Sequence, residues 1–506
     1  MMADILLSTL NARYRHTAFA LRYLLANLAE LRPRALLLEF ECSDLPEEVA
    51  ERILQHAPRI VALSIYLWNV EGCTRLVRLL KRLRPELVVV LGGPEVSFET
   101  EQQVIVQEAD YVICGEGEQL FYALCRALLA GQRPVEKIQQ APPLDLSQIV
   151  LPYDAYLPQD LSHRLLYVER SRGCSYRCSF CLSALDETVR LFPLGPFLQA
   201  MQTLLERGAR QFKFVDRTFN LHTGDCIQVL EFFLRHISLG LFLHFEWVPD
   251  RLPEALKGVI RQFPPGTLQF EIGIQSLDPA VQARIHRRQN REKSMENVRW
   301  IVQHTSVHVH ADLIVGLPGE DLASFAAGFD QLVAVHPHEI QIGILKRLRG
   351  APIQADTQAF GMIYNPDPPY DLLCNDRLDF ATLRRLKRLA RYWDLFGNSG
   401  RFPHVRGILC TQPEPFYAFL ALSDWLFAQI GRTHEIALRH QFDWLYRGLT
   451  EGLGWDQEMV LTALSQDFNR GALREPPDCL RAQSPPKSLQ TTRTKQATPA
   501  RQSRHQ

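Results

Sequence analysis

The sequence predicts an α/β protein with two successive parallel sheets and a mostly helical region after them. Short apolar runs alternate with amphipathic stretches over residues 3–130, and this alternation resumes from Leu165 to about Lys346. Strands of a parallel sheet are buried on both faces, so they appear as continuous apolar runs separated by helices. After Pro352 the strand-like alternation stops, and Leu, Arg, Phe and Trp recur at helical spacing.

The composition indicates a large globular protein. A chain of 506 residues with 46% hydrophobic residues is long enough for about three domains with substantial cores. The 56 basic residues equal the 56 acidic ones, so the net charge gives no indication of nucleic-acid binding. No apolar run reaches the ~18 residues of a membrane helix, and Met1–Leu10 is interpreted as a first strand and not as a signal peptide. Eleven scattered cysteines suit a reducing cytoplasm better than a disulfide framework.

The first domain is expected over residues 1–130 as a doubly wound sheet. Helices are expected over Ala18–Leu31 and Cys73–Leu83. Residues 131–162 are rich in proline and are interpreted as a linker. The five strand candidates are Asp4–Leu7, Ala35–Phe40, Ile60–Ile65, Leu87–Leu91 and Tyr111–Cys114.

The second domain is expected over residues 163–350. Its six strand candidates fit a partial (β/α)6 barrel better than a complete eight-stranded one. A mostly helical domain over 351–480 and a disordered basic tail over 481–506 are expected to follow. The six candidates are Leu166–Glu169, Phe212–Val215, Leu241–Phe245, Leu268–Ile274, Val309–Val315 and Ile340–Leu345.

Two groups of side chains have a structural interpretation beside a functional one. His308 and His310 share one face of a strand, so a metal pair is conceivable, but without a third ligand core or rim histidines are favoured. Four aromatic residues of the helical region could line a substrate pocket, but the favoured interpretation is that they belong to its hydrophobic core. These are Trp393, Phe396, Phe416 and Tyr417.

The most informative motif is a run of three cysteines, Cys174, Cys178 and Cys181, directly after a strand candidate. A cubane iron–sulfur cluster normally takes four cysteines, so three ligands leave one iron open for chemistry. Structural or zinc cysteines are the alternative, but no fourth ligand lies nearby at zinc-site spacing. The run resembles the cluster loop of the radical S-adenosylmethionine (radical SAM) enzymes.

The resemblance implies a [4Fe-4S] cluster held by these cysteines, S-adenosylmethionine on the open iron, and a one-electron reductant such as flavodoxin or ferredoxin. Reductive cleavage of S-adenosylmethionine then yields a 5′-deoxyadenosyl radical. Further segments resemble the family over about 180 residues. Phe214–Asn220 resembles its F-V-D-x-x-F segment, with Asp216 expected at the methionine end of the cofactor or, alternatively, as a helix N-cap.

Two later strand ends also match the family. Glu271–Ser276 resembles its E-x-G-x-Q-S motif, in which Glu271, Gly273 and Gln275 face one side and Ser276 lies at the rim. Gly316–Glu320 resembles its G-L-P-G-E segment, which passes near the adenine; a tight turn with a capping Glu is a compatible interpretation. From these motifs Glu271, Gly273, Gln275, Ser276, Gly316 and Pro318 are expected to contact S-adenosylmethionine.

Residues 1–130 resemble the cobalamin-binding, Rossmann-like domain of one radical SAM subgroup. Glycines at the carboxyl ends of parallel strands allow close approach to a bulky ligand. A cobalt-ligating histidine is not implied, because the loop around His16 lacks the D-x-H-x-x-G pattern. The residues expected to contact cobalamin are Ser64, Gly92, Gly93, Gly115 and Glu116.

The segments Asn11–His16 and Leu345–Gly350, with the helical C-terminal region, resemble a little-studied branch of this subgroup. The resemblance implies a cytoplasmic enzyme, with methyl transfer to an unactivated carbon of an unknown substrate as the leading reaction. Cyclisation or ring rearrangement is an alternative. A methylthiotransferase with a second cluster on Cys42, Cys73 and Cys114 is another, and a binding module with vestigial sites is a third.

Overall fold

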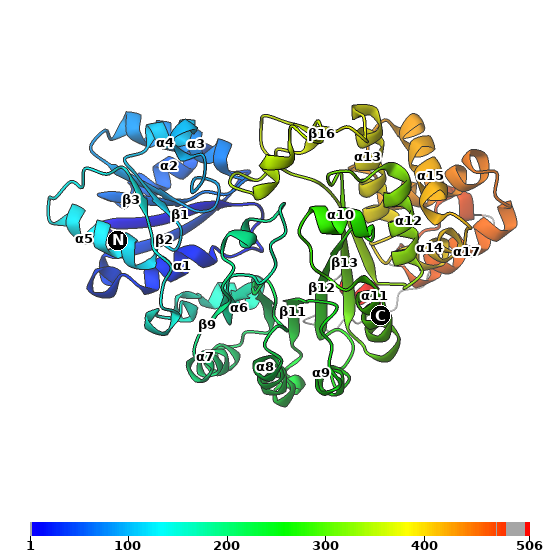
Figure 1. Ribbon diagram of the computed structural model, residues 1–506, viewed down its shortest axis with the longest axis horizontal. Helices are drawn as coiled ribbons and strands as arrows, with labels where there is room; N and C mark the ends of the chain where they lie inside the picture. The colour runs from blue at the N-terminus through cyan, green and yellow to red at the C-terminus, as the bar shows by residue number, and fades with distance from the viewer. Residues whose placement is uncertain (1–2, 472, 482–500, 506) are drawn as a thin grey trace. The chain divides into compact units, whose positions relative to one another are not determined.

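The computed structural model describes residues 3–471, 473–481 and 501–505 (Figure 1). The chain forms two compact units. Unit 1 contains residues 1–217, 347–354 and 366–370, and unit 2 contains residues 218–346, 355–365 and 371–506. Within the described part of the chain, no helix is both long and apolar enough to cross a membrane.

The first sheet of unit 1 is parallel and has the strand order β2-β1-β3-β4-β5-β6. The predicted doubly wound sheet is confirmed, but the prediction of five strands was wrong. The sixth strand, β6, lies in the segment interpreted as a linker. Its polar sequence, Ile-Gln-Gln, contains no apolar run that would indicate a strand. The strands are β1 (Ile5–Asn11), β2 (Ala35–Glu41), β3 (Ile60–Ser64), β4 (Val88–Gly92), β5 (Tyr111–Cys114) and β6 (Ile138–Gln140).

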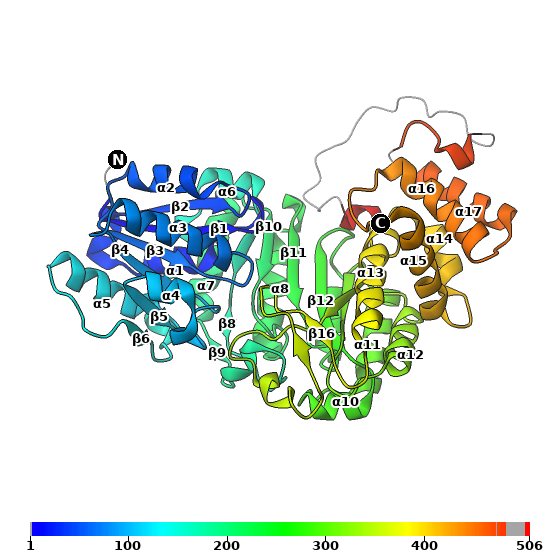
Figure 2. The same ribbon diagram turned by 90° about the horizontal axis from the view of Figure 1, so that it is seen from above.

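Helices cover both faces of this sheet (Figure 2). Alternate residues of β1 point to opposite faces, so Leu6 and Leu10 join one apolar core and Ile5 and Leu7 join the other. The first core also takes residues of α2 (Pro46–Leu54), α3 (Val70–Leu83) and α4 (Val104–Glu108). The second takes residues of α1 (Phe19–Ala26) and α5 (Glu118–Leu129).

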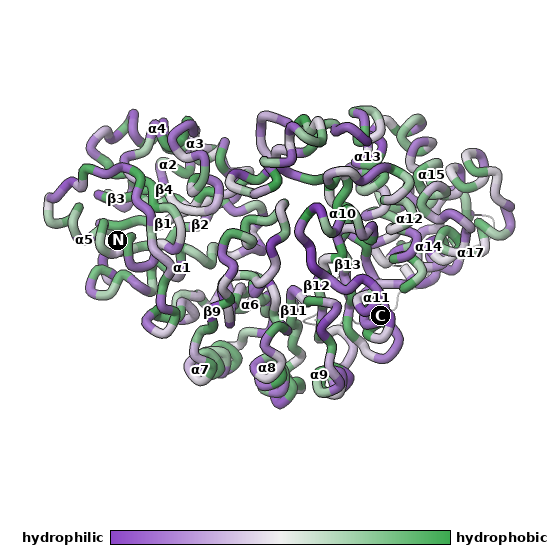
Figure 3. Tube along the Cα trace, viewed as in Figure 1, coloured by the Kyte–Doolittle hydropathy of each residue, from purple (hydrophilic) through white to green (hydrophobic). Residues whose placement is uncertain are grey.

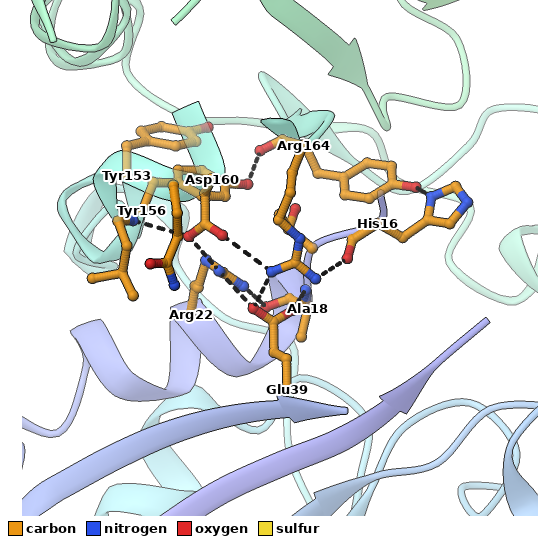
Figure 4. A network of polar contacts seen from close by, with 12 residues as sticks. His16, Ala18, Arg22, Glu39, Tyr153, Tyr156, Asp160 and Arg164 are labelled. Carbon is orange, nitrogen blue, oxygen red and sulfur yellow. Dashed lines mark hydrogen bonds and ion pairs between the residues drawn. The ribbon is translucent and has the colours of Figure 1, made fainter. Parts of the chain in front are cut away.

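A buried network of two arginines and two carboxylates fastens α6 (Pro158–His163) to this domain (Figure 4). Arg22 of α1 binds Glu39 of β2 at 2.8 Å and Asp160 of α6 at 2.9 Å. Arg164 contacts the same two carboxylates at 2.7 and 3.1 Å. Arg22, Asp160 and Arg164 are buried and Glu39 is largely buried, and Arg22 also lies over the ring of Tyr156. Burial opposes the charge of Glu39, but the two arginines outweigh it and lower its pKa to about 2.

We expect Glu39→Gln to lower the free energy of unfolding by about 3–5 kcal/mol, because it leaves two buried guanidinium groups with one carboxylate fewer. The folded pKa of Glu39 is about 2, below its ordinary value of 4.5. Its stabilising contribution is therefore fully present above about pH 4.5 and is lost as the pH falls towards 2. Urea unfolding between pH 7 and pH 3 measures both effects.

The matched control is Glu48→Gln, at an exposed position of α2. This variant should stay within about 0.5 kcal/mol of the wild type. An unfolding free energy that falls with acid equally in Glu39→Gln and in the wild type would contradict the assignment.

After α6 the chain begins a second parallel sheet. Within unit 1, β7 (Leu166–Val168) pairs with β10 (Gln211–Phe214), and α7 (Leu194–Glu206) connects toward β10. A short antiparallel pair, β8 (Ser171–Arg172) and β9 (Arg190–Leu191), encloses the three-cysteine run. The whole sheet has the order β14-β13-β12-β11-β10-β7, so its six strands follow chain order, as predicted for a partial barrel.

Unit 2 supplies the remaining parallel strands, and each is separated from the next by helices. Polar and apolar colours alternate along α8 in Figure 3, and its apolar residues are the buried ones. The strands are β11 (Phe242–Glu246), β12 (Leu268–Gln275), β13 (His308–Val315) and β14 (Glu339–Ile344). The helices are α8 (Thr223–Arg235), α9 (Glu254–Ile260), α10 (Pro279–Arg284), α11 (Arg291–His304) and α12 (Leu322–Val333).

The C-terminal region is mostly helical, as predicted, but it begins with a two-stranded ribbon that the sequence did not indicate, β15 (Ile363–Tyr364) and β16 (Leu372–Cys374). Trp393 is buried and makes edge contacts with Phe329 and Phe419, so the core interpretation holds for it. Phe396 and Phe416 are buried too, whereas Tyr417 is exposed. The helices are α13 (Phe380–Phe396), α14 (Pro403–Cys410), α15 (Pro415–Ile430), α16 (Leu438–Arg447) and α17 (Gln457–Arg470).

Most of the tail predicted over 481–506 lies outside the described residues. The described part near its end forms a short 3-10 helix, Gln502–His505. Arg501 just before it pairs with Glu339 at 2.7 Å and with Asp394 at 2.6 Å. Glu339 also accepts from His308, so this histidine belongs to a polar cluster at the edge of β13 and β14.

Candidate functional site

A pocket of about 980 Å³ lies in unit 1 at the carboxyl edge of the first sheet. The last residues of β1, β3, β4 and β5 line it, namely Asn11, Ser64, Gly92 and Cys114. The strand order reverses direction between β1 and β3, and ligands of open α/β sheets bind at that point. The volume is at the upper end of the range for cofactor pockets.

The predicted glycines all line this pocket. Gly93 has φ +107°, and a Cβ atom there would lie 2.5 Å from the carbonyl oxygen of Ile65. Gly115 has φ +89° and a similar constraint from the Ala141 carbonyl at 3.1 Å. Gly92 has an ordinary backbone, and its missing side chain leaves room in the pocket, because the nearest atom to a Cβ would be 3.6 Å away. Ser64 is buried at the same edge.

Glu116, also predicted as a cofactor contact, is already held by protein groups. Arg190 of β9 donates two hydrogen bonds to its carboxylate, at 2.9 and 2.7 Å, and the amide of Leu144 donates a third at 2.9 Å. Burial alone would raise the pKa of Glu116, but these donors outweigh it and lower the pKa. The structure therefore places Glu116 in the wall of the pocket, where it ties β9 to the first sheet.

A charged cluster that the sequence motifs did not indicate also lines the pocket. Arg172 of β8 pairs with Glu118 at 2.6 Å and with Glu169 at 2.9 Å, and its guanidinium lies over the ring of Tyr23. All of these residues line the pocket. Burial and the paired carboxylates act in opposite directions, and the net result is a raised Arg172 pKa. The signal in the sequence was the run Glu169-Arg170-Ser171-Arg172 beside the cysteines.

His16 lines the same pocket, and its Nδ1 lies 2.6 Å from the hydroxyl of Tyr167. Burial lowers the pKa of His16, and the nearby cations Lys213, Arg15, Arg13 and Arg164 lower it further. The imidazole is therefore neutral at pH 7.

The three cysteines follow β8 in one loop of unit 1. Gly173 turns the chain into this loop with φ +90°, where a side chain would collide with the Thr188 carbonyl. The amide of Cys174 donates to Asp186 at 2.9 Å, and the amide of Cys181 donates to Cys178 at 3.0 Å. Cys174 and Cys178 are buried and Cys181 is partly exposed. Burial raises the pKa of the Cys174 thiol, and the neighbouring Cys181 and Cys178 add to this.

Among the described residues, no three His, Cys, Asp or Glu side chains are grouped closely enough to hold a single metal ion. A cubane cluster needs a different arrangement, since each cysteine binds a separate iron. Of the cysteines considered for a second cluster, Cys73 and Cys114 lie in an aliphatic core and Cys42 is exposed.

Asp216 is buried at the end of β10. Its carboxylate accepts hydrogen bonds from the Arg170 amide, at 3.2 and 3.0 Å, and from the Ser171 hydroxyl at 2.5 Å. Burial outweighs these donors and raises its pKa to about 7. The alternative of a helix N-cap was wrong, because the next helix begins only at Thr223, after His222.

In unit 2, the predicted residues of β12 alternate in exposure: Glu271, Gly273 and Gln275 are partly exposed, whereas the intervening isoleucines are buried. Glu271 pairs with His244 at 2.8 Å. The space beside Gly273 is occupied by the amide of Gln275. A register shift between Gly273 and Gln275, and a φ of +70° at Gln275, distort the end of this strand.

Ser276 and Glu320 join the two remaining motifs. The Ser276 hydroxyl forms a short hydrogen bond with the buried Glu320 carboxyl group, and burial raises the Glu320 pKa to about 8. The turn interpretation made Glu320 a helix cap, and this was wrong. The neighbouring Asp321 caps α12. Gly316 has φ +91°, and the Pro318 carbonyl accepts from Arg284 at 2.8 Å.

Glu320→Gln should remove a pH-dependent loss of stability. The folded pKa of about 8 lies above the ordinary 4.5, so folding disfavours the ionised form and stability falls as the pH rises from about 4.5 to 8. A neutral amide keeps a partner for Ser276 and avoids that loss. The unfolding free energy of the variant should exceed that of the wild type by about 2–4 kcal/mol at pH 8.5 and equal it near pH 4.

The control is Asp321→Asn, which retains an N-cap at an exposed position. It should follow the pH dependence of the wild type. If Glu320→Gln does the same, Glu320 is ionised throughout and the assignment fails.

Comparison with known protein families agrees with this arrangement. The model of the B12 binding domain family matches residues 6–125, which include strands β1 to β5 of the first sheet and most of the residues that line its pocket. The Radical SAM superfamily model matches residues 168–332, which include the cysteine loop. The chain therefore contains a B12-binding domain followed by a radical SAM domain. A third model, a family of proteins of unknown function named DUF4080, matches residues 358–504 of its helical region.

Curated relatives match part of this chain. An uncharacterized methyltransferase of Pyrococcus horikoshii is 26% identical over 302 residues, 54% of this chain and 63% of that one. The cobalamin-dependent radical SAM methyltransferase TokK of Streptomyces tokunonensis is 25% identical over 344 residues, 59% of this chain and 48% of that one. A tRNA-2-methylthio-N(6)-dimethylallyladenosine synthase of Acinetobacter baylyi is 26% identical over 265 residues, which are 49% of this chain and 54% of that one. The chain thus spans less than two thirds of the length of these relatives.

Among solved structures, the radical SAM methyltransferase TsrM of Kitasatospora setae, with cobalamin and a [4Fe-4S] cluster bound, has a TM-score of 0.60. The match covers 93% of this chain and 100% of that one at 15% identity. At this identity the likeness shows the fold.

Proposed function

We propose that this protein is a cobalamin-dependent radical SAM methyltransferase acting on an unactivated carbon. The observation that carries the proposal is that unit 1 contains both a large pocket at the carboxyl edge of the B12-type sheet and a loop with three cysteines. When bound, the cluster and S-adenosylmethionine supply a 5′-deoxyadenosyl radical, and cobalamin supplies the methyl group.

The residues present suit these groups. Cys174, Cys178 and Cys181 are soft thiolate donors of the kind that iron–sulfur clusters use. Gly92 leaves room at the pocket edge, Gly93 and Gly115 allow the backbone to turn there with positive φ, and Ser64 offers a hydroxyl. The neutral His16, hydrogen-bonded to Tyr167, and the pair Arg172–Glu169 form a fixed polar wall.

For S-adenosylmethionine we propose contacts from the predicted strand-end residues. Asp216, with a pKa of about 7, accepts a hydrogen bond from an ammonium group when ionised. Gln275 presents an amide group at the end of β12, next to Ser276, whose hydroxyl is hydrogen-bonded to Glu320. The full set is Asp216, Glu271, Gly273, Gln275, Ser276, Gly316 and Pro318.

Replacing Cys174, Cys178 or Cys181 with Ala should abolish both the cluster absorbance and the cleavage of S-adenosylmethionine, because a cubane needs all three thiolates. Anaerobic reconstitution, followed by iron analysis and assay of 5′-deoxyadenosine, measures this. Cys42→Ala, at an exposed position, is the control and should keep iron and cleavage. Loss of about half the iron in Cys42→Ala would instead favour the methylthiotransferase alternative.

Gly92→Leu should abolish cobalamin binding and leave the cluster intact. The new side chain enters the pocket from a position without backbone strain, so the fold is kept. Cobalamin content by absorbance, with iron content measured on the same sample, tests this. Gly195→Leu, at an exposed position with open space around it, is the matched control and should retain cobalamin. Full cobalamin in Gly92→Leu would show that the pocket serves another ligand.

A flavodoxin or ferredoxin is the kind of reductant that the reaction needs, and cyclisation or rearrangement with the same cofactors is the alternative outcome. Product analysis with labelled S-adenosylmethionine separates these reactions, because only methyl transfer leaves label on the product.

A further inference from the structure

Residues 347–354, here called the strap, belong to unit 1 although they follow the second sheet in the chain. They lie outside the three matched family segments, which end at 332 and resume at 358. The strap contacts two loops. The first, the pocket loop, comprises residues 93–99; the second, the cysteine loop, comprises residues 173–186.

Charged side chains join the strap to the pocket loop. Arg347 binds Glu99 with both terminal nitrogens, at 3.0 and 3.2 Å. Arg349 contacts Glu95 at 2.9 Å and Glu99 at 2.9 Å. The Tyr370 hydroxyl donates to the buried Glu95 at 2.7 Å. Bidentate arginine–carboxylate contacts fix geometry as well as charge, so both carboxylates of this loop are oriented by the strap.

A close approach of backbone to ring strengthens this attachment. Gly350 has φ +81°, and a Cβ atom there would lie 2.3–2.7 Å from three ring atoms of Phe98. Phe98 itself lines the pocket, as do Gly93, Pro94 and Ser97 of the same loop. The strap backbone thus packs against a side chain that forms the pocket surface.

The strap also holds the cysteine loop. The amide of the fully buried Ile353 donates to the carbonyl of Ser179 at 2.7 Å, between the second and third cysteines. Only two residues, Ala351 and Pro352, lie between Gly350, against Phe98, and Ile353, against Ser179. A displacement of either loop is therefore transmitted to the other through a short segment in which Ala351 and Ile353 are buried.

We propose that the strap couples the two cofactor sites of unit 1: it positions Phe98 and the pocket loop according to the state of the cysteine loop. Arg347, Arg349 and Gly350 are positioning residues in this scheme. The inference rests on the proposed function in that the two ligands are taken to be cobalamin and an iron–sulfur cluster. Coupling between sites is reciprocal, so occupancy of either site should strengthen binding at the other.

The test measures the dissociation constant of hydroxocobalamin by absorbance, with iron-free and with iron-reconstituted protein. We expect the wild type to bind at least about fivefold more tightly when iron is present. In the double variant Arg347→Gln/Arg349→Gln, this ratio should fall to about one. Arg349→Lys keeps the positive charge but loses the planar guanidinium group that binds two carboxylates at once, so it should give an intermediate ratio. Arg385→Gln removes an arginine that pairs with Asp424 in the helical region and should retain the wild-type ratio.

A second measurement uses cofactor-free protein, so it decides on the strap even if the proposed function fails. Hydrogen exchange followed by mass spectrometry should be faster in residues 93–99 and in residues 173–186 of the double variant than in Arg385→Gln. Faster exchange in the pocket loop alone would overturn the coupling. A wild-type ratio of one, or an unchanged ratio in the double variant, would overturn it as well.

Discussion

The buried pairing of Arg22 and Arg164 with Glu39 and Asp160 is the interaction on which unit 1 depends (Figure 4). It joins α1, β2 and α6, and Arg164 is followed directly by the residues of β7. Because the network fixes where β7 begins, it also fixes Tyr167 and Glu169, which form one wall of the pocket. Burying charged groups costs desolvation free energy, and they stabilise the fold only if every partner is in place. The linker that carries Asp160 and Arg164 is therefore held in one position.

The pocket that results has two kinds of wall. On the sheet side, glycines and small residues at strand ends remove side chains, and on the other side, arginine–carboxylate pairs supply fixed polar groups. Glu116 and Arg190 connect these walls. Preorganised polar groups of this kind keep their orientation when a ligand binds, so the entropic cost of ordering side chains on binding is small.

Most strands could be predicted because parallel strands are long apolar runs; β5 was placed at its observed bounds, and the six strands of the second sheet were all found. Strand β6 was missed because it is short and polar, and β15 and β16 were missed because they are only two and three residues long. The pocket glycines and the cysteines could be identified because local sequence determines them. The partners of Glu116, Glu320 and the strap arginines could not, because each contact joins residues far apart in the chain and depends on how the elements pack.

The central claim is that one chain holds a single cubane cluster and cobalamin. The most direct measurement is the iron, sulfide and cobalamin content of protein purified without oxygen from cells supplied with cobalamin. The account predicts about four irons and one cobalamin per chain. About eight irons with no cobalamin would contradict it and assign the first domain to a second cluster.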